Sequence, residues 1–230
     1  MIVLRLLLLL FVQSTLASSE KINSEPLELY KILKNDQGWV FNEEQQGIEI
    51  AMKKIEGHEI PALMVNYETS VSLSLIQSIL MDVENYSTFL KSSGKMVTKQ
   101  LEKSESSVVG YQFIPVSVPF IDDRHYFFKL MKNNLKENNS DLLVKWFLLD
   151  QNADSINGAR SYVENGTYLK YGAGLWMAEK TDSKSVRLSY RLFMDPGGLI
   201  PRFLTEKVNE ISILNLFKDV LAEAERRMNL

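Results

Sequence analysis

The chain has 230 residues, 45% hydrophobic and 24% charged, and its 26 basic and 29 acidic side chains give a formal net charge of -3. These values are typical of a globular protein with a sizeable core, and no Lys/Arg cluster points to nucleic acid as a partner. The absence of cysteine excludes disulfides, thiolate metal sites and a cysteine nucleophile.

The N-terminus is predicted to be an export signal. Arg5 precedes the apolar run at residues 6–12, and Thr15 and Ala17 suit the small-residue positions of a signal-peptidase site. The run is shorter than the ~20 apolar residues of a transmembrane helix, so a membrane anchor is the weaker alternative. An exported chain without disulfides favours the bacterial periplasm, or secretion if the source is eukaryotic. The expected organisation is a signal peptide at 1–17, a disordered spacer at 18–23 and one domain at 24–230.

The first half of this domain predicts a helix, a hairpin and a second helix. Residues 25–33 have the apolar spacing of a short helix. Residues 48–52 and 63–67 alternate apolar and polar side chains, which indicates two antiparallel strands joined by a turn. Ser70 is predicted to be the N-cap of a helix that runs to about Asn85.

The second half predicts a run of antiparallel strands and then the longest helix. The strands are expected at residues 96–103, 107–115, 124–131, 142–149, 161–168, 169–179 and 186–194. The breaker at residues 195–198 ends the last strand. Ile211 and Leu214 belong to the apolar stripe of the terminal helix. This order of elements predicts one α+β domain in which a curved antiparallel sheet grips a helix.

The strand at residues 124–131 sets one arginine among aromatic side chains. By the two-residue period, Arg124 shares a face with Tyr126 and Phe128. If that face is the interior, the guanidinium needs a buried polar partner or a ligand. The alternative is that Arg124 pairs with Asp122 or Asp123 in a solvated turn.

Motifs for catalysis and for cofactor binding are absent from the sequence. His58 and His125 do not have metal-ligand spacing, and no nucleophile-elbow or phosphate-binding motif occurs. We therefore expect no metal, no cofactor and no catalytic residue. His58 is expected in a turn, and His125 on the outer face of its strand.

Aromatic and aliphatic side chains recur on the faces that the alternation assigns to the interior. They are Tyr67, Tyr111, Phe113, Tyr126, Phe128, Trp146, Tyr171, Tyr190 and Leu192. Each fits plain core packing, but together they indicate an interior cavity, because one helix covers a strongly curved sheet incompletely. Composition alone leaves both a filled core and a pocket open.

Three segments resemble the START domain, the steroidogenic-acute-regulatory-related lipid-transfer family. They are Asp82-Val83-Glu84-Asn85-Tyr86-Ser87-Thr88-Phe89, similar to the end of its second helix, Pro119-Phe120-Ile121-Asp122-Asp123-Arg124-His125-Tyr126, similar to its Pro-Phe…Arg-Asp-Phe/Tyr segment, and Asp195-Pro196-Gly197-Gly198-Leu199-Ile200-Pro201, similar to the start of its terminal helix. The resemblance covers the mature chain. It implies a helix-grip fold, with the sheet wrapped on the terminal helix around a tunnel for one hydrophobic ligand.

The resemblance also implies a role for Arg124. In sterol-binding members the corresponding arginine lines the tunnel and pairs with an earlier acidic residue, for which Glu105 is the candidate here. His125 departs from the family, in which many members carry aspartate at this position.

The leading hypothesis is a monomeric carrier that takes one lipid, a sterol, hopanoid, phospholipid or fatty acid, through an aqueous compartment with transient contacts to membranes. Loops near residues 114–123 and 155–160 are expected to open for the ligand. The expected lipid-binding residues are Arg124, Glu105, Tyr111, Phe113, Tyr126, Phe128, Trp146, Tyr171, Tyr190, Leu192, Ile211 and Leu214.

Two alternatives remain open. The first is a helix-grip cyclase or hydrolase in which Arg124, Glu105, Tyr111 or Tyr190 polarises a carbonyl, although the sequence offers no nucleophile and base to support an enzyme. The second is a closed interaction module without a ligand, which would have a fully packed interior.

Overall fold

The computed structural model describes residues 26–93, 96–116, 121–135, 140–153, 156, 165–181, 185–198 and 202–229. The predicted signal peptide and spacer lie outside these residues. So do parts of the loops that were expected to open, at positions 117–120, 155 and 157–160.

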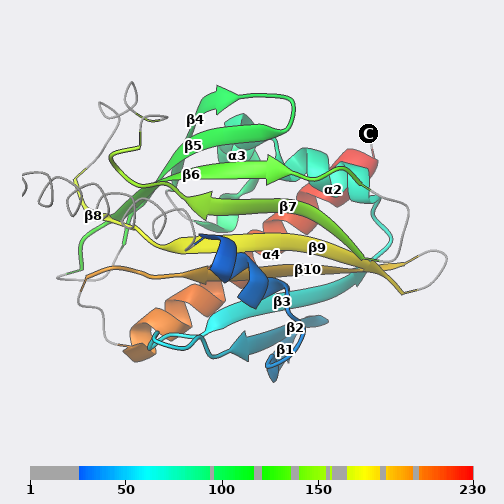
Figure 1. The fold of residues 1–230 in the computed structure, drawn as a ribbon. Coiled ribbons are helices and arrows are strands. Elements are labelled where there is room, and N and C mark those ends of the chain that lie inside the picture. The colour runs from blue at the N-terminus through cyan, green and yellow to red at the C-terminus, as the bar shows by residue number, and fades with distance from the viewer. Residues whose placement is uncertain are drawn as a thin grey trace, which may run out of the picture.

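One sheet forms the centre of the molecule (Figure 1), and its strands follow the order β1-β2-β3-β10-β9-β7-β6-β5-β4. All neighbours on this path are antiparallel, and β8 pairs with β6 in parallel. The strands are β1 Val40–Gln45, β2 Ile48–Lys53, β3 Ala62–Thr69, β4 Val97–Lys103, β5 Ser107–Ile114, β6 Arg124–Lys132, β7 Ser140–Leu148, β8 Thr167–Tyr168, β9 Gly172–Lys180 and β10 Val186–Met194.

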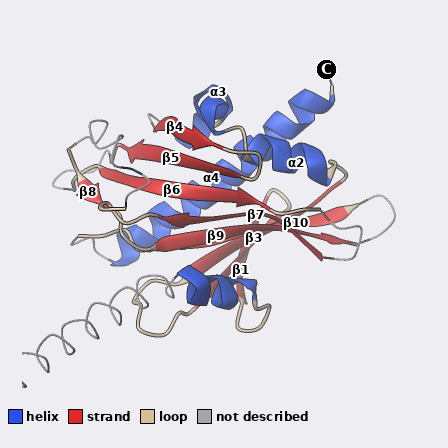
Figure 2. Ribbon diagram, turned by 45° about the horizontal axis from the view of Figure 1, so that its top comes forward, coloured by secondary structure: helices blue, strands red, loops and turns tan. Residues whose placement is uncertain are grey.

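The helices lie on both faces of this sheet. The long helix α4 runs across one face, and the helix at residues 26–34 lies on the opposite one (Figures 1 and 2). Besides the helix at residues 26–34, the structure has α2 Leu73–Leu80, α3 Tyr86–Phe89, α4 Arg202–Met228 and two 3-10 turns, η1 Val83–Asn85 and η2 Lys91–Ser93. No helix within the described ranges is long and apolar enough to cross a membrane. The predicted α+β fold, a curved antiparallel sheet with a long C-terminal helix, is confirmed.

Both faces of the sheet are buried, which the sequence alone did not indicate. On β10, Leu188 and Tyr190 face α4, whereas Phe193 joins a second apolar cluster under the N-terminal helix. A third cluster covers the outer face of β5 and β6. His125 lies on that outer face as expected, but it is buried, with its ring edge-on to Tyr168 at 5.3 Å. Desolvation by this burial lowers the pKa of the His125 imidazole.

Most of the predicted elements are present, with shifted ends. The hairpin predicted at residues 48–52 and 63–67 is β2 and β3, paired in antiparallel register. The edge strand β1 was not predicted. Helix α2 is shorter than expected, because Ser72 rather than Ser70 is its N-cap and accepts a hydrogen bond from the amide of Leu75 at 3.3 Å.

Two further elements differ in length from the prediction. Of the strand predicted at residues 161–168, the described part forms only β8, and residues 161–164 lie outside the described ranges. The terminal helix continues to Met228, beyond the predicted apolar stripe, and carries Arg226 and Arg227 in its last turn.

Two buried cations hold the C-terminal end of the N-terminal helix against the sheet. Lys53 Nζ donates to the carbonyls of Ile32 at 2.7 Å and Asn35 at 2.8 Å. Arg191 Nη1 donates at 3.1 Å to the carbonyls of residues 33 and 34, and Nη2 binds the carboxylate of Asp36 at 2.6 Å. Since the last carbonyls of a helix have no partners within it and carry its negative dipole end, these cations satisfy and stabilise that end.

Replacing Arg191 with Met is therefore expected to lower the free energy of unfolding by about 2–3 kcal/mol, because buried carbonyls lose their donors. The matched control is Arg187→Met on the same strand, whose ion pair with Glu49 is more than a third exposed and is expected to contribute less than about 1 kcal/mol. Urea denaturation of the two variants measures the difference. Equal losses would show that the N-terminal helix does not depend on Arg191.

Candidate functional site

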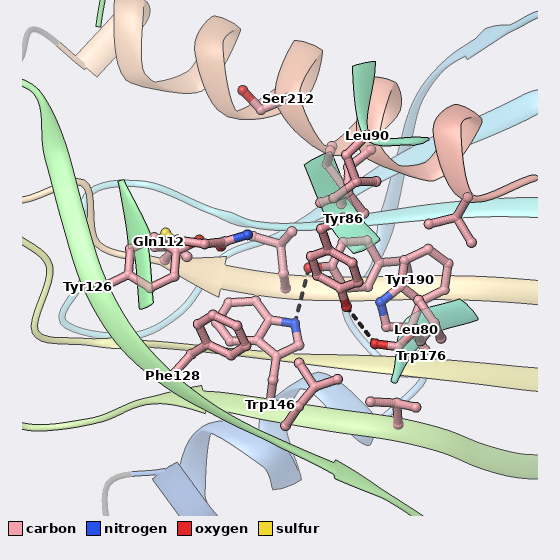
Figure 3. A pocket seen from close by; sticks show the side chains of 17 residues that line it. Leu80, Tyr86, Leu90, Gln112, Tyr126, Phe128, Trp146, Trp176, Tyr190 and Ser212 are labelled. Carbon is pink, nitrogen blue, oxygen red and sulfur yellow. Dashed lines mark hydrogen bonds between the residues drawn. The ribbon is translucent and has the colours of Figure 1, made fainter. Parts of the chain in front are cut away.

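A cavity of about 160 Å³ lies between the inner face of the sheet and helix α4 (Figure 3). Its described lining consists of aromatic, aliphatic and neutral polar side chains, without a charged one among them: Leu80, Tyr86, Leu90, Gln112, Tyr126, Phe128, Leu130, Val144, Trp146, Trp176, Tyr190, Leu192, Met194, Ser212, Ile213, Leu216 and Val220. Among the described residues, no group of His, Asp or Glu side chains is placed to hold a metal ion. The chemistry of the site is therefore that of a hydrophobic pocket with a few hydrogen-bonding groups.

Two glycines make room for the aromatic floor of the cavity. Gly110 faces Phe128 across β5 and β6, and Gly174 faces Trp146 across β9 and β7. A Cβ atom would lie 2.5 Å from the Phe128 ring at the first position and 2.4 Å from Trp146 Nε1 at the second. Because each ring lies over the backbone of a glycine, both positions must lack a side chain.

A stack of three rings joins the sheet to α4. The ring of Trp176 is parallel to that of Tyr190, with centroids 4.3 Å apart, and to that of Phe217 on α4 at 5.4 Å. Stacked aromatic pairs stabilise the fold by more than the burial of their apolar area alone. The stack therefore fixes both the position of α4 and the orientation of Tyr190.

Gln112 brings an amide to the cavity. Its Oε1 accepts a hydrogen bond from the Tyr126 hydroxyl, and its Nε2 donates to Thr98 Oγ1 at 3.1 Å. The amide orientation is thus fixed from both ends. Gln112 is buried and its position on β5 faces Tyr126 on β6.

Two further tyrosines contribute hydroxyls. Tyr86 donates to the carbonyl of Leu80, and Tyr190 accepts from Trp146 Nε1 at 3.1 Å (Figure 3). Desolvation by burial raises the pKa of Tyr86, Tyr126 and Tyr190 far above the ordinary value for tyrosine. All three hydroxyls therefore stay protonated and neutral at physiological pH.

The cavity reaches the surface beside α4. Ser212 lines the cavity and is also exposed, whereas the neighbouring Ile211 points outward and is 47% exposed. A ligand can therefore contact solvent, or enter, next to Ser212.

The C-terminal half of α4 is fastened by charged groups. Arg227 binds Asp82 and Glu223, each at 2.7 Å, which ties α4 to the turn after α2. The Asp219 carboxylate accepts hydrogen bonds from the amide and hydroxyl of Ser92, both at 2.8 Å. Hydrogen bonds from Arg226 and Arg227 hold the pKa of Glu223 at about 2, below its ordinary value of 4.5.

The structure brings together five of the predicted site residues and leaves the others outside the cavity. Tyr126, Phe128, Trp146, Tyr190 and Leu192 line it. Leu214 is buried in the same apolar core without lining the cavity. The residues placed elsewhere are Arg124, Glu105, Tyr111, Phe113, Tyr171 and Ile211.

Arg124 is buried but does not line the described cavity. Its guanidinium donates to three backbone carbonyls, those of Asp122, Pro196 at 2.7 Å and Gly197 at 3.2 Å. The predicted partner Glu105 is exposed in the turn before β5, whereas Arg124 pairs with Ile114 at the other end of that strand. The predicted Arg124–Glu105 pair is therefore corrected. Arg124 instead joins the start of β6 to the connection between β10 and α4.

The sequence prediction placed the wrong set of alternate β5 residues on the inner face of the sheet. Tyr111 and Phe113 point into the outer cluster, and Gln112 is the residue that enters the cavity. Tyr171 also lies on the outer face, where its ring stacks on His58 at 5.3 Å. Aromatic character misled the prediction because the outer face is buried too.

Twelve of the 17 lining residues were not among the predicted site residues, and four of them show why. Gln112 was overlooked because it is polar, and Tyr86 because it begins the short helix α3, beyond the apolar stripe of α2. Trp176 could have been found by its position opposite Tyr190 in the β9–β10 register, two residues after Gly174. Ser212 carries no sequence signal, since a serine on a helix is ordinarily a surface residue.

Comparisons with known proteins match the fold. No model of a known family and no curated protein sequence matches the chain. The STAR-related lipid transfer protein from Xanthomonas axonopodis (fragment 25–204) is 13% identical with a TM-score of 0.65, covering 82% of this chain and 99% of that one. Human StAR-related lipid transfer protein 5 is 8% identical with a TM-score of 0.66, covering 93% and 99%. The Zhui aromatase/cyclase from Streptomyces sp. R1128 is 18% identical with a TM-score of 0.51, covering 73% and 94%.

These likenesses and the sheet topology show that the chain has a START-like helix-grip fold. The expectation from the sequence resemblance is confirmed at this level. At these identities the likeness concerns the fold, and the function has to be argued from the cavity itself.

Replacing Gly174 with Ala is expected to destabilise the protein by about 1–3 kcal/mol, because the new Cβ displaces the Trp146 ring from the backbone of β9. The near-ultraviolet circular dichroism of the tryptophans should change with it. The control is the same substitution in a Trp146→Leu background, where the cost should largely disappear. If Gly174→Ala destabilises the Trp146→Leu background by the same amount, the glycine is required by the backbone of β9 and not by the Trp146 ring.

The charge network around Glu223 predicts acid sensitivity. A carboxylate with a pKa of about 2 in the folded state and 4.5 otherwise stabilises the fold above pH 4.5, and this contribution is lost as the pH falls toward 2. The stability difference between wild type and Glu223→Gln should therefore shrink over this window, measured by urea denaturation at a series of pH values. Glu225→Gln, at an exposed position of the same helix, is the control and should show no such dependence.

Proposed function

We propose that this protein binds one hydrophobic lipid in the cavity beneath α4 and carries it through an aqueous compartment. The observation that carries the proposal is an aromatic and aliphatic cavity, neutral throughout its described lining, that opens beside Ser212. The START-like fold supports it, since the Xanthomonas and human proteins with this fold are described as lipid transfer proteins. The predicted signal peptide adds the proposal that the compartment lies outside the cytoplasm.

Burial of apolar surface supplies the affinity. Transfer from water gains about 25 cal/mol per Å², so about 300 Å² of ligand surface gains about 7 kcal/mol before ordering costs. The fixed rings of Tyr190, Trp176 and Phe217 add little to those costs, because their orientation does not depend on the ligand.

The size of the cavity limits what it holds as it stands. An apolar cavity of about 150 Å³ accepts a molecule such as benzene, and sites for drug-sized ligands occupy about 300–1,000 Å³. The 160 Å³ cavity therefore holds one compact group or a short chain, and a complete lipid requires its walls to separate. The opening beside Ser212 is the place where α4 and the sheet would move apart, in transient contact with a membrane.

The enzyme alternative has less support from the site. The Zhui aromatase/cyclase shares the fold. The described lining, however, offers tyrosines with raised pKa values as its titratable groups, and such groups are poor acids and bases at neutral pH. We therefore propose the carrier over the cyclase.

The proposal is tested at the mouth of the cavity. Ser212→Trp is expected to fill the opening and lower lipid uptake by about tenfold or more, whereas Ile211→Trp on the outward side should retain it. Native mass spectrometry of protein purified from its own host identifies a bound lipid. Titration with a sterol, a hopanoid, a fatty acid and a phospholipid compares the variants. Absence of any co-purified lipid, together with no uptake of these four classes by wild type, would contradict lipid binding.

A further inference from the structure

Of the three tyrosine hydroxyls in the cavity lining, that of Tyr190 has a hydrogen available to donate to a ligand. Tyr86 donates to the Leu80 carbonyl and Tyr126 donates to Gln112 Oε1, so both hydrogens are used within the protein. Tyr190 differs, because its oxygen accepts the hydrogen of Trp146 Nε1 at 3.1 Å. An indole nitrogen can only donate. The hydroxyl hydrogen of Tyr190 therefore has no acceptor among the residues that the structure describes.

The position of this hydroxyl is fixed before any ligand arrives. Tyr190 is 4% exposed, and its ring stacks on Trp176 with an interplanar angle of 13°. Trp146, which holds the Tyr190 oxygen, is itself placed by the close approach of its ring to Gly174. A buried donor without an acceptor is unfavourable, and a ligand oxygen at this point would remove the penalty. The hydroxyl is thus a preorganised donor inside an apolar cavity.

The surroundings of this donor disfavour charge. The described lining contains no charged side chain, and Tyr86, Tyr126 and Tyr190 all resist ionisation because they are desolvated. A ligand carboxylate or phosphate placed among the same side chains meets the same desolvation cost without a cation to offset it. A ketone, ester or alcohol oxygen accepts a hydrogen bond without carrying a charge into the cavity.

We propose that the cavity selects an uncharged ligand with a hydrogen-bond-accepting oxygen, and that Tyr190 donates its hydroxyl hydrogen to that oxygen. This proposal rests on the proposed function, in which the cavity takes a hydrophobic ligand. It adds the chemical class of that ligand and the residue that recognises it. Anionic fatty acids and phospholipids are then poor ligands for the polar end of the cavity.

Three probes of equal chain length test the selection: 2-octanone, octane and octanoate. All three are short chains, and binding to the full chain can be followed through the fluorescence of the cavity residues Trp146 and Trp176. The wild-type protein is expected to bind 2-octanone about tenfold more tightly than octane, and octanoate more weakly than 2-octanone. Tyr190→Phe should lose the preference for the ketone over octane.

The matched control is Tyr168→Phe, which removes a hydroxyl that donates to the backbone carbonyl of Leu149 in the outer cluster, away from the cavity. It should keep the preference for the ketone. A second measurement does not depend on a variant that folds: the carbonyl stretch of 2-octanone bound to wild type should move to lower wavenumber than in an alkane solvent, as for a hydrogen-bonded ketone.

The outcomes separate the two proposals. If wild type binds neither octane nor 2-octanone nor any larger lipid, the proposed function fails and this inference fails with it. If wild type binds octane and 2-octanone equally, if Tyr190→Phe keeps the preference, or if the carbonyl stretch does not move, the role of Tyr190 is overturned while lipid binding stands. If octanoate binds as tightly as 2-octanone, the selection of uncharged ligands is overturned.

Discussion

The stack of Tyr190, Trp176 and Phe217 is the contact on which the cavity depends. Trp176 lies between a ring of the sheet and a ring of α4, and the separations of 4.3 Å and 5.4 Å set how closely the helix approaches. The three stacked rings separate the helix from the strands on one side of the stack, so α4 cannot pack against the whole curved sheet. The cavity is the volume that remains beside this spacer. The glycines at positions 110 and 174 enlarge it, because they let two other rings lie over the backbone of a neighbouring strand.

Predictions from the sequence succeeded where alternation and burial agreed. On β10 the alternation of apolar and polar residues is unambiguous, and Tyr190 and Leu192 were placed in the interior correctly. Tyr126 and Phe128 of β6 also line the cavity as predicted, although both faces of that strand are buried. On β5 both faces are buried, so hydrophobicity does not distinguish them and the larger aromatic residues were assigned inward. Gln112 could not be found by any rule that excludes polar residues from an interior. The N-terminal helix and the segment around Tyr168 cover the outer face. These tertiary contacts produce no periodic pattern in the sequences of the strands.

Arg124 shows a second limit of sequence reasoning. Its alternation correctly indicated a buried guanidinium, yet its partners are main-chain carbonyls, which every residue possesses. The same is true of Lys53 and Arg191, which bind carbonyls at the end of the N-terminal helix. In this protein, buried Lys and Arg side chains of the strands donate hydrogen bonds to the main-chain carbonyls of segments outside the sheet. Such a role cannot be read from acidic residues near in sequence, and the pair with Glu105 that the family resemblance implied is not formed.

The distribution of contacts along α4 indicates where the cavity can open. From Phe217 to Arg227 the helix is held by the ring stack, by the hydrogen bonds of Asp219 with Ser92 and by the ion pair of Arg227 with Asp82. The backbone before it turns through Gly197 and Gly198, both with positive φ, and Arg124 holds the carbonyls of residues 196 and 197. Separation of α4 from the sheet as a whole would break all these contacts together. Separation near Ser212, between the two fastened ends, breaks the fewest described ones, and it exposes the part of the cavity that already meets the surface. For the proposed lipid ligand, the route that breaks the fewest described contacts therefore passes Ser212 and leads to the proposed donor, the hydroxyl of Tyr190.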